Sequence, residues 1–384
     1  MSAKLFCCVL ISCMLLAGCR SEPELPPPPQ HKMVSLKFMD SLTIPLSAFP
    51  FPIGHIDQAK MQRNELWLTG TGQSAYGAWD SFIYGPLFSS DDSTKVLFSR
   101  MIPRYRRGFN RFQMLDRQMV LFGKAAVLHV DEDLGVEQQV FLDGPDTLDL
   151  SSSGLSQLVL PDKNGHPKYI VGVENRYAGF SGARFSKVPG AYAIYSDNGS
   201  LETYFGRYPD LFFEPGHLLS NRLSAITYHD HRVFVTHLGE ESIHEYNTRG
   251  KKIRSYPLPP SKLFDPTLQY VSSRQLPQGH PSENPSLIDT VKKYSTHFIT
   301  GFVVDQNIIH LLLVDRRFVD GQQKHKTIYR RWDMTNEVYM EDALPIPTYT
   351  YGLLAEATED TVKVFYWNRL HKKVQIDSYH IPSF

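Results

Sequence analysis

Two adjacent stretches decide the fold of this chain: AITYHDHRVFV at 225–235 and IHEYNTRGKKIRSY at 243–256. In each, two β-rich, largely apolar segments flank a polar turn, His229-Asp230-His231 in the first and Asn247-Thr248-Arg249-Gly250 in the second. Short apolar segments separated by such turns predict β-hairpins. Two successive hairpins give four antiparallel strands, which is the content of one propeller blade.

The same hairpin pattern recurs along the chain. Six hairpins span 56–68, 112–122, 157–173, 225–235, 302–314 and 353–366. Their turns are spaced by roughly fifty to seventy-five residues, which suits propeller blades that carry insertions. A second, more polar strand pair follows, as at 192–205. Four strands per unit, apolar inside and polar outside, predict an all-β, six-bladed β-propeller over residues 33–384.

The ring needs a closing strand, and the N-terminal segment 34–46 lies outside the six units. We expect it to pair with the last strand, 373–381, which closes the last blade and removes exposed sheet edges. The residues leave one alternative open, namely two β-sandwich domains built from unrelated hairpins. The inter-blade insertion at 259–297, with a short helix at 286–294, is expected to be either a lid over the central opening or a disordered insertion.

The N-terminus reads as an export and anchoring signal. Residues 5–16 form an apolar run too short to span a bilayer as a mature helix, and small residues then lead into Cys19. By resemblance to bacterial lipoprotein signals, residues 1–18 are removed and Cys19 is lipidated. The proline-rich residues 19–32 predict an extended tether. Because residues 20–22 lack the aspartate-led start of inner-membrane retention, we expect an outer-membrane lipoprotein, on either the periplasmic or the surface side.

The lipoprotein signal, the tether and six hairpin units together resemble the TolB-like six-bladed β-propeller lipoprotein family of gut-type Gram-negative bacteria. The phrases at 205–209 and 246–251 carry the same resemblance. It covers the whole mature chain and implies the fold and the anchor. Members of this family are mostly domains of unknown function, so the resemblance implies no catalytic residue.

Composition limits the partners and the chemistry. Lys plus Arg and Asp plus Glu both number 40, so bulk attraction to nucleic acid is not expected. The cysteines are Cys7, Cys8, Cys13 and Cys19, so the mature chain has no thiol for a disulfide, a thiolate nucleophile or a Cys–metal site. The histidines around Asp230 are expected to splay from a turn, and we find no motif for a cofactor or a metal.

Arginine and tyrosine recur in one set of predicted loops. Strand direction alternates within a blade, so the turns between strands two and three and the connections between blades share one face of the disc. Arginine binds carboxylate, sulfate or phosphate through a planar fork, and tyrosine adds contact area and one hydroxyl. The predicted ligand-binding residues are Arg104, Tyr105, Arg106, Arg107, Arg111, Arg176, Tyr177, Arg184, Arg207, Tyr208, Arg316 and Arg317.

These observations predict a non-catalytic binding or scaffold module, held to the membrane through Cys19. Its partner is an envelope protein, or an acidic glycan or peptide. Three other interpretations stay open at this point. The arginines merely brace their loops; or the chain is a hydrolase or lyase for an extracellular polymer, with acids converging in a central pocket; or it is a structural subunit with apolar blade edges.

Overall fold

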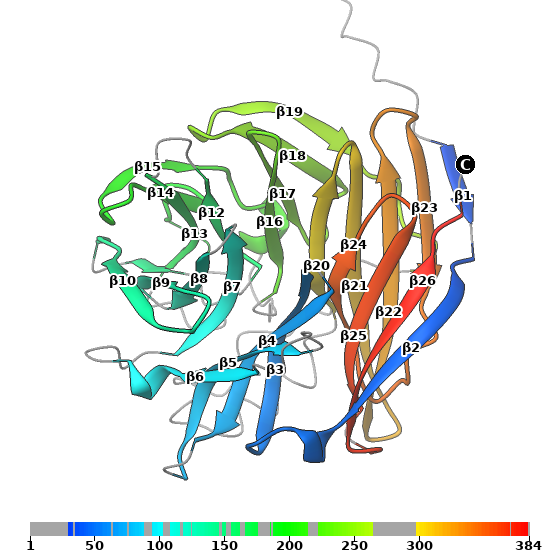
Figure 1. Ribbon diagram of the computed structural model, residues 1–384. Helices are drawn as coiled ribbons and strands as arrows, with labels where there is room; N and C mark the ends of the chain where they lie inside the picture. The colour runs from blue at the N-terminus through cyan, green and yellow to red at the C-terminus, as the bar shows by residue number, and fades with distance from the viewer. Residues whose placement is uncertain are drawn as a thin grey trace, which may run out of the picture.

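The computed structural model of the chain describes residues 30–33, 35–62, 64–74, 77–87, 94–102, 108–115, 118–123, 125–145, 148–150, 155–161, 166–175, 185, 187–213, 222–263, 297–368 and 370–382. Six β-sheets are arranged around a central axis, and the chain passes through them in sequence order (Figure 1). Helical structure in these ranges is limited to short 3₁₀ turns, η1 (Leu46–Ala48), η2 (Ser99–Met101) and η4 (Asp210–Phe213).

Each sheet is one blade, and four of its strands are neighbours in sequence in blades 1 to 5. Blade 1 contains β3 (Ile53–Gln62), β4 (Glu65–Gln73), β5 (Trp79–Leu87) and β6 (Lys95–Phe98). Blade 2 contains β7 (Phe109–Leu115), β8 (Gln118–Gly123), β9 (Ala126–Val130) and β10 (Val136–Phe141). Blade 3 contains β12 (Gln157–Leu160), β13 (Lys168–Asn175), β14 (Tyr192–Tyr195) and β15 (Leu201–Phe205), with β11 (Leu148–Leu150) also on β13. Blade 4 contains β16 (Ser224–His229), β17 (Arg232–His237), β18 (Ser242–Asn247) and β19 (Lys252–Pro257). Blade 5 contains β20 (His297–Asp305), β21 (Ile308–Val319), β22 (Gln322–Asp333) and β23 (Val338–Ala343). Blade 6 contains β24 (Gly352–Ala357), β25 (Thr361–Asn368), β26 (Lys373–His380) and β2 (Lys37–Pro45).

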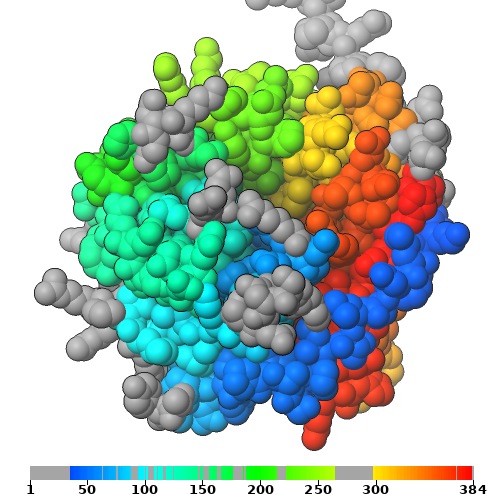
Figure 2. Space-filling view, in the orientation of Figure 1, coloured from blue at the N-terminus to red at the C-terminus, as the bar shows by residue number. Residues whose placement is uncertain are grey.

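The first strand of every blade lies at the hub. The inner strands β3, β7, β12, β16, β20 and β24 contact one another in that order, and β24 contacts β3. This closed circuit confirms the six-bladed propeller and excludes two separate sandwiches. In the space-filling view the colours also follow one another around the molecule, and the blue N-terminal strand lies against the red last blade (Figure 2).

The predicted closing strand is present. β2 runs antiparallel to β26, with Leu42 opposite Ile376 and Ile44 opposite Val374. A further strand, β1 (Gln30–Met33), runs parallel to β23 on the outer edge of blade 5. Residues 30–32, expected to end the tether, therefore belong to a strand. The rest of that tether, residues 1–18 and Cys19 lie outside the described residues, as does 264–296 of the predicted insertion.

Alternating strand direction gives the disc two distinct faces. We call the side with the inter-blade connections and the turns between strands two and three the connecting face, and the other side the opposite face. β23, as a fourth strand, runs toward the connecting face, and β1 is parallel to it. The chain therefore enters the propeller at Gln30 from the opposite face.

Burial follows the position of each strand in its blade. The central strand β9 (AVLHV) is buried at every residue, whereas the outermost strand β2 is exposed at all positions except Ile44. Apolar faces of neighbouring blades pack on one another, so the hydrophobic core is a series of layers between blades. No helix among the described residues is long and apolar enough to cross a membrane.

Glutamine side chains join the first three blades at the hub. The Gln58 amide accepts a hydrogen bond from Phe112 N (2.9 Å) and donates one to Phe112 O (3.3 Å). Gln113 does the same one blade further on, accepting from Val159 N (2.8 Å) and donating to Val159 O (3.1 Å). Each glutamine thus satisfies both backbone groups of one residue on the next inner strand, which has no ladder partner on its hub side.

Removing such a clamp is expected to weaken the ring. Gln113→Ala leaves the N–H and C=O of Val159 without partners, so we expect a loss of about 1–3 kcal/mol in the free energy of unfolding. Urea denaturation followed by tyrosine and tryptophan fluorescence measures it. Gln138→Ala, at an exposed position on the outermost strand β10, is the matched control and should change little. Equal changes in the free energy of unfolding for the two substitutions would show that the Gln113 side chain does not stabilise the ring.

Candidate functional site

Five of the twelve predicted ligand-binding residues lie in the described part of the chain. They are Arg111, Arg207, Tyr208, Arg316 and Arg317. The other seven, Arg104, Tyr105, Arg106, Arg107, Arg176, Tyr177 and Arg184, lie outside it. All five described residues fall at the connecting-face ends of strands or in connections, but they belong to three different blades.

Two of the five brace the connection after blade 3. The Tyr208 side chain is buried, and its hydroxyl donates to the backbone oxygens of Val173 (2.9 Å) and Ala191 (3.2 Å). Arg207 donates to the Asp210 carboxylate three residues on, at 2.5 Å. Tyr208 therefore holds the loop against the blade, and we leave both residues out of the binding surface.

The sequence predicts a loop at Arg316 and Arg317. The structure instead places both residues on strand β21, which continues to Val319. β21 and β22 are each twelve residues long, and they pair as far as Val319 and Gln322. Beyond Asp315 every residue of the two paired strands is exposed, apart from Arg316, Gln323 and His325, which are half-buried. The result is a two-stranded extension of blade 5 on the connecting face, which we call the blade-5 hairpin (residues 315–326).

Aromatic stacking makes the base of the blade-5 hairpin rigid. The Arg316 guanidinium lies 5.5 Å from the ring centroid of Phe298, which packs edge-to-face on Tyr351 at 5.1 Å. Tyr351 in turn lies 5.5 Å from the His325 ring. Burial, and then the charge of Arg316, lowers the pKa of His325 to about 4, so this histidine is neutral at physiological pH.

Charged and apolar side chains share the tip of the blade-5 hairpin. Arg317 donates through Nε to the buried Asp315 carboxylate at 3.0 Å, while its own side chain stays 63% exposed. Phe318 and Val319 follow at 49% and 38% exposure. A rigid element that presents an arginine beside an exposed phenylalanine has the composition of a protein-interface hot spot.

Exposed apolar side chains gather on the same side of the molecule. Of the thirteen large apolar residues that are exposed in the described ranges, eight lie at the connecting face. These eight are Trp79, Met101, Phe141, Phe213, Phe318, Val319, Tyr349 and Leu370. These residues come from several blades, and they make this face richer in exposed apolar side chains than the opposite face, so we take it as the candidate interaction surface.

A second group of polar residues lies at the hub. Arg111 is on the inner strand β7, where the sequence predicts a loop, and its Nε and Nη1 atoms are buried without a hydrogen-bond partner. Burial lowers the pKa of this guanidinium to about 10. Lys60 lies nearby on the inner strand β3, and burial together with the positive charge of Arg111 lowers its pKa to about 8. Two cations thus share a desolvated region.

Hydroxyl groups complete this group. The Tyr192 hydroxyl is buried, it interacts electrostatically with Arg111, and it lies within reach of the hydroxyls of Ser156 and Ser224. Burial raises the pKa of Tyr192, so it stays protonated. We call Lys60, Arg111, Tyr192, Ser156 and Ser224 the hub cluster. Its members come from four consecutive blades.

The acid nearest to the hub cluster in sequence is engaged elsewhere. Asp57, on β3, accepts hydrogen bonds from Arg222 Nη2 at its backbone oxygen (3.2 Å) and at Oδ1 (3.4 Å). His55 Nε2 also lies 3.4 Å from Asp57 Oδ1. Arg222 precedes β16 of blade 4, which stands opposite blade 1 in a ring of six, so this pair spans the centre. Within the described residues, no carboxylate pairs with Lys60 or Arg111.

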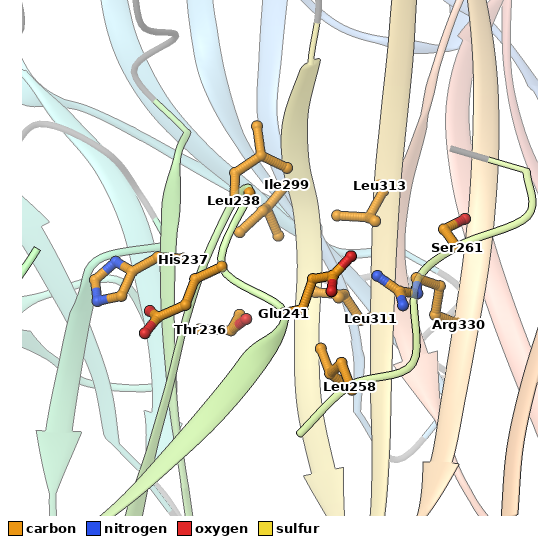
Figure 3. A pocket seen from close by; sticks show the side chains of 12 residues that line it. Thr236, His237, Leu238, Glu241, Leu258, Ser261, Ile299, Leu311, Leu313 and Arg330 are labelled. Atoms are coloured by element: carbon orange, nitrogen blue, oxygen red, sulfur yellow. The ribbon is translucent and has the colours of Figure 1, made fainter. Parts of the chain in front are cut away.

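A small pocket, partly open to solvent, lies between blades 4 and 5 (Figure 3). Its polar lining residues are engaged in the framework. His237 Nδ1 is 2.7 Å from Ser224 Oγ, and Arg330 Nη2 donates to Pro259 O at 2.6 Å. Ser261 donates to Glu341 at 2.6 Å. Burial lowers the pKa of His237 to about 4, so it carries no charge at neutral pH. These bonds hold the two blades together.

Sequence reasoning identified Arg111 but not the other members of the hub cluster. The only local signal is that Lys60 stands between Ala59 and Met61 on a predicted inner strand, in a segment that also contains Asp57 and Gln58. Ser156 and Ser224 stand directly before or at the start of inner strands. Tyr192 carries no such signal, since a tyrosine at the start of a β-strand is ordinary.

The comparisons with known proteins bear on the fold. No protein-family model matches the sequence, and no curated protein matches it. Among solved structures the chain is similar to a member of the DUF4221 family from Bacteroides vulgatus, at 12% identity, with 92% of this chain and 100% of that chain covered and a TM-score of 0.57. A candidate exported protein from Bacteroides fragilis gives 8% identity, coverage of 92% and 99%, and a TM-score of 0.49. At this level of identity, the first likeness shows a shared fold and no more.

Proposed function

We propose that this protein is a lipid-anchored binding module of the TolB-like propeller type, which engages an acidic envelope protein or glycan through its connecting face. The observation that carries the proposal is the blade-5 hairpin. It projects from the propeller, it is fixed at its base by the Arg316–Phe298–Tyr351 stack, and it exposes Arg317 beside Phe318. Arginine and aromatic side chains on a preformed element bind partners at low entropic cost.

The path of the chain supports this orientation. The polypeptide enters at Gln30 from the opposite face, because β1 is parallel to β23. If Cys19 carries lipid, the membrane therefore lies toward the opposite face. The connecting face, with its eight exposed apolar side chains, then points away from the bilayer and toward soluble or surface partners.

Catalysis has less support from the described residues. A hydrolase or lyase for an extracellular polymer needs acids that converge at the substrate. At the hub Lys60 and Arg111 are cations, and the inner-strand acids Asp57 and Glu356 are engaged by Arg222 and Lys363. We therefore propose binding as the function.

The proposal predicts that the hairpin tip decides partner recovery. The mature protein is immobilised through its C-terminus and exposed to envelope extract and to acidic polysaccharide beads, and bound material is quantified by mass spectrometry and sugar analysis. Arg317→Glu combined with Phe318→Ser should reduce recovery of the main partner by roughly tenfold or more, since a hot-spot arginine and an aromatic are both lost.

The matched control carries the same pair of changes on the other side of the disc. Arg249→Glu combined with Ile253→Ser alters an exposed arginine and an exposed apolar residue in the β18–β19 hairpin of blade 4, at the opposite face. It should bind as the unmodified protein does. Loss of binding in both double variants, or in neither, would refute a partner surface at the blade-5 hairpin.

A further inference from the structure

We propose that the hub cluster is a binding site for an oxyanion, such as a carboxylate, sulfate or phosphate group. This site is separate from the blade-5 hairpin, and either proposal stands if the other fails. The observation behind it is that two cations, Lys60 and Arg111, share one desolvated place beside the Tyr192 hydroxyl, and that two buried guanidinium nitrogens of Arg111 have no hydrogen-bond partner.

The buried guanidinium of Arg111 has hydrogen-bonding capacity that the protein does not use. Nε and Nη1 of Arg111 are both buried, and neither reaches an acceptor. The Tyr192 hydroxyl is buried next to this guanidinium, with the hydroxyls of Ser156 and Ser224 within its reach. Folded proteins seldom leave buried donors unpaired, and a charged donor is the costliest to leave so. A bound group with two or more acceptor oxygens satisfies these donors together, in the geometry in which a guanidinium holds a carboxylate or sulfate.

The hub cluster contains two positive charges at close range. Lys60 and Arg111 repel each other, and no carboxylate of the described chain is paired with either. The neighbouring Asp57 is committed to Arg222 across the hub. Two adjacent, largely desolvated cations persist only at a cost unless a counter-charge is supplied, and a bound anion supplies it. A cationic or neutral ligand cannot supply it.

The members of the hub cluster are held by four different blades. The five residues lie on or beside the inner strands of blades 1 to 4, except Tyr192, which reaches in from β14. They are therefore fixed by four separate sheets, which gives the site a rigid arrangement that no single loop provides. The hydroxyls of Ser156 and Ser224 are fixed beside it, because Ser156 Oγ donates to Ser224 O at 3.3 Å and Ser224 Oγ lies 2.7 Å from His237 Nδ1.

Isothermal titration calorimetry tests the proposal with sodium sulfate, sodium phosphate and sodium acetate as separate probes, at constant ionic strength, in a buffer free of other oxyanions. The full mature protein should bind at least one of the three with a one-to-one stoichiometry. Binding of sulfate and phosphate only identifies a tetrahedral group, and binding of acetate only identifies a carboxylate. Each of these results supports the site.

Variants separate the hub cluster from surface charge. Lys60→Met and Arg111→Met should each weaken binding at least tenfold, and Tyr192→Phe by roughly threefold to tenfold, while Arg249→Glu in the β18–β19 hairpin should bind as the unmodified protein does. Circular dichroism confirms that each variant is folded, and Tyr192→Phe, which removes one oxygen, is the mildest of the three. The proposal is overturned if no probe binds up to about 50 mM, or if Arg111→Met binds as well as the unmodified protein.

Discussion

Replacing Glu341 with alanine is expected to lower the free energy of unfolding by about 3–5 kcal/mol, because it removes the counter-charge of a buried arginine. Glu341, on β23, is 1% exposed. It accepts hydrogen bonds from Ser261 Oγ and Lys262 N, both at 2.6 Å, and from the Tyr339 hydroxyl at 3.1 Å. Arg330 donates to that same hydroxyl and is itself buried. Alanine leaves these donors and the Arg330 charge without their acceptor.

The stability that the Glu341 carboxylate contributes depends on pH. Burial opposes ionisation, but the hydrogen bonds from Ser261 and Lys262 and the charge of Arg330 lower the pKa of Glu341 below its ordinary value. Its contribution to stability is therefore complete above the unfolded pKa, near pH 4.5, and is lost as the pH falls through the lower folded pKa.

Urea denaturation at pH 7 measures the loss, and Glu132→Ala in an exposed turn is the control, with an expected change of under about 0.5 kcal/mol. At low pH the two variants should converge toward the unmodified protein in relative stability. A Glu341→Ala variant as stable at pH 7 as Glu132→Ala would mean that Arg330 does not depend on this carboxylate.

Replacing Lys60 with methionine is expected to stabilise the protein at neutral pH by about 2 kcal/mol, which is the reverse of most core substitutions. Burial and the charge of Arg111 lower the pKa of Lys60 from 10.5 to about 8. Below pH 8 the folded chain therefore carries the full penalty of the buried ammonium group. Between pH 8 and 10.5 the unfolded chain binds a proton that the folded chain does not, so stability rises with pH across this window.

Methionine has a similar length and no charge, so Lys60→Met removes the penalty at pH 7. Its advantage should fall as the pH rises from 8 and should be gone by about pH 10.5, where the unmodified lysine is neutral in both states. Urea denaturation in oxyanion-free buffer at pH 7 and pH 10 tests this, with Lys252→Met on the exposed strand β19 as control. A destabilised Lys60→Met variant at pH 7, or a gain that does not vary with pH, would contradict a strained lysine.

This prediction also connects stability with function. A residue that costs stability in the free protein, and whose removal abolishes oxyanion binding, is retained for the ligand rather than for the fold. Addition of a bound oxyanion should correspondingly raise the melting temperature of the unmodified protein and leave Lys60→Met unchanged.

The fold was predictable from sequence because hairpins are local. Apolar alternation on both sides of a turn, as at 225–235, is visible within about a dozen residues, and the closing pair of 34–46 with 373–381 followed from the need to cover an edge. β1 escaped prediction because Gln30–Met33 is short and polar, with no periodicity, and gains its partner only from the tertiary structure.

The sites were harder to predict, for a different reason. Tyrosine is a residue type that is common in binding surfaces, and Tyr208 was predicted to be one such contact. Its side chain is instead buried, and its hydroxyl donates two hydrogen bonds to the backbone, so it holds the loop against blade 3. Arg111, predicted in a loop, lies on an inner strand, and its partners Lys60 and Tyr192 come from other blades. Which side chains converge at a hub depends on register and bulges in four sheets, and no local pattern encodes that convergence.

The pairing of β2 with β26 also governs when the molecule is able to fold. β2 precedes the strands of all six blades' hairpins, and its partner β26 follows the strands of blades 1 to 5. Until these two strands pair, blade 6 lacks its fourth strand and the two ends of the propeller are not joined. A contact of such high sequence separation forms slowly. Closure of the ring is therefore expected to come late in folding, after the hairpins of the single blades have formed.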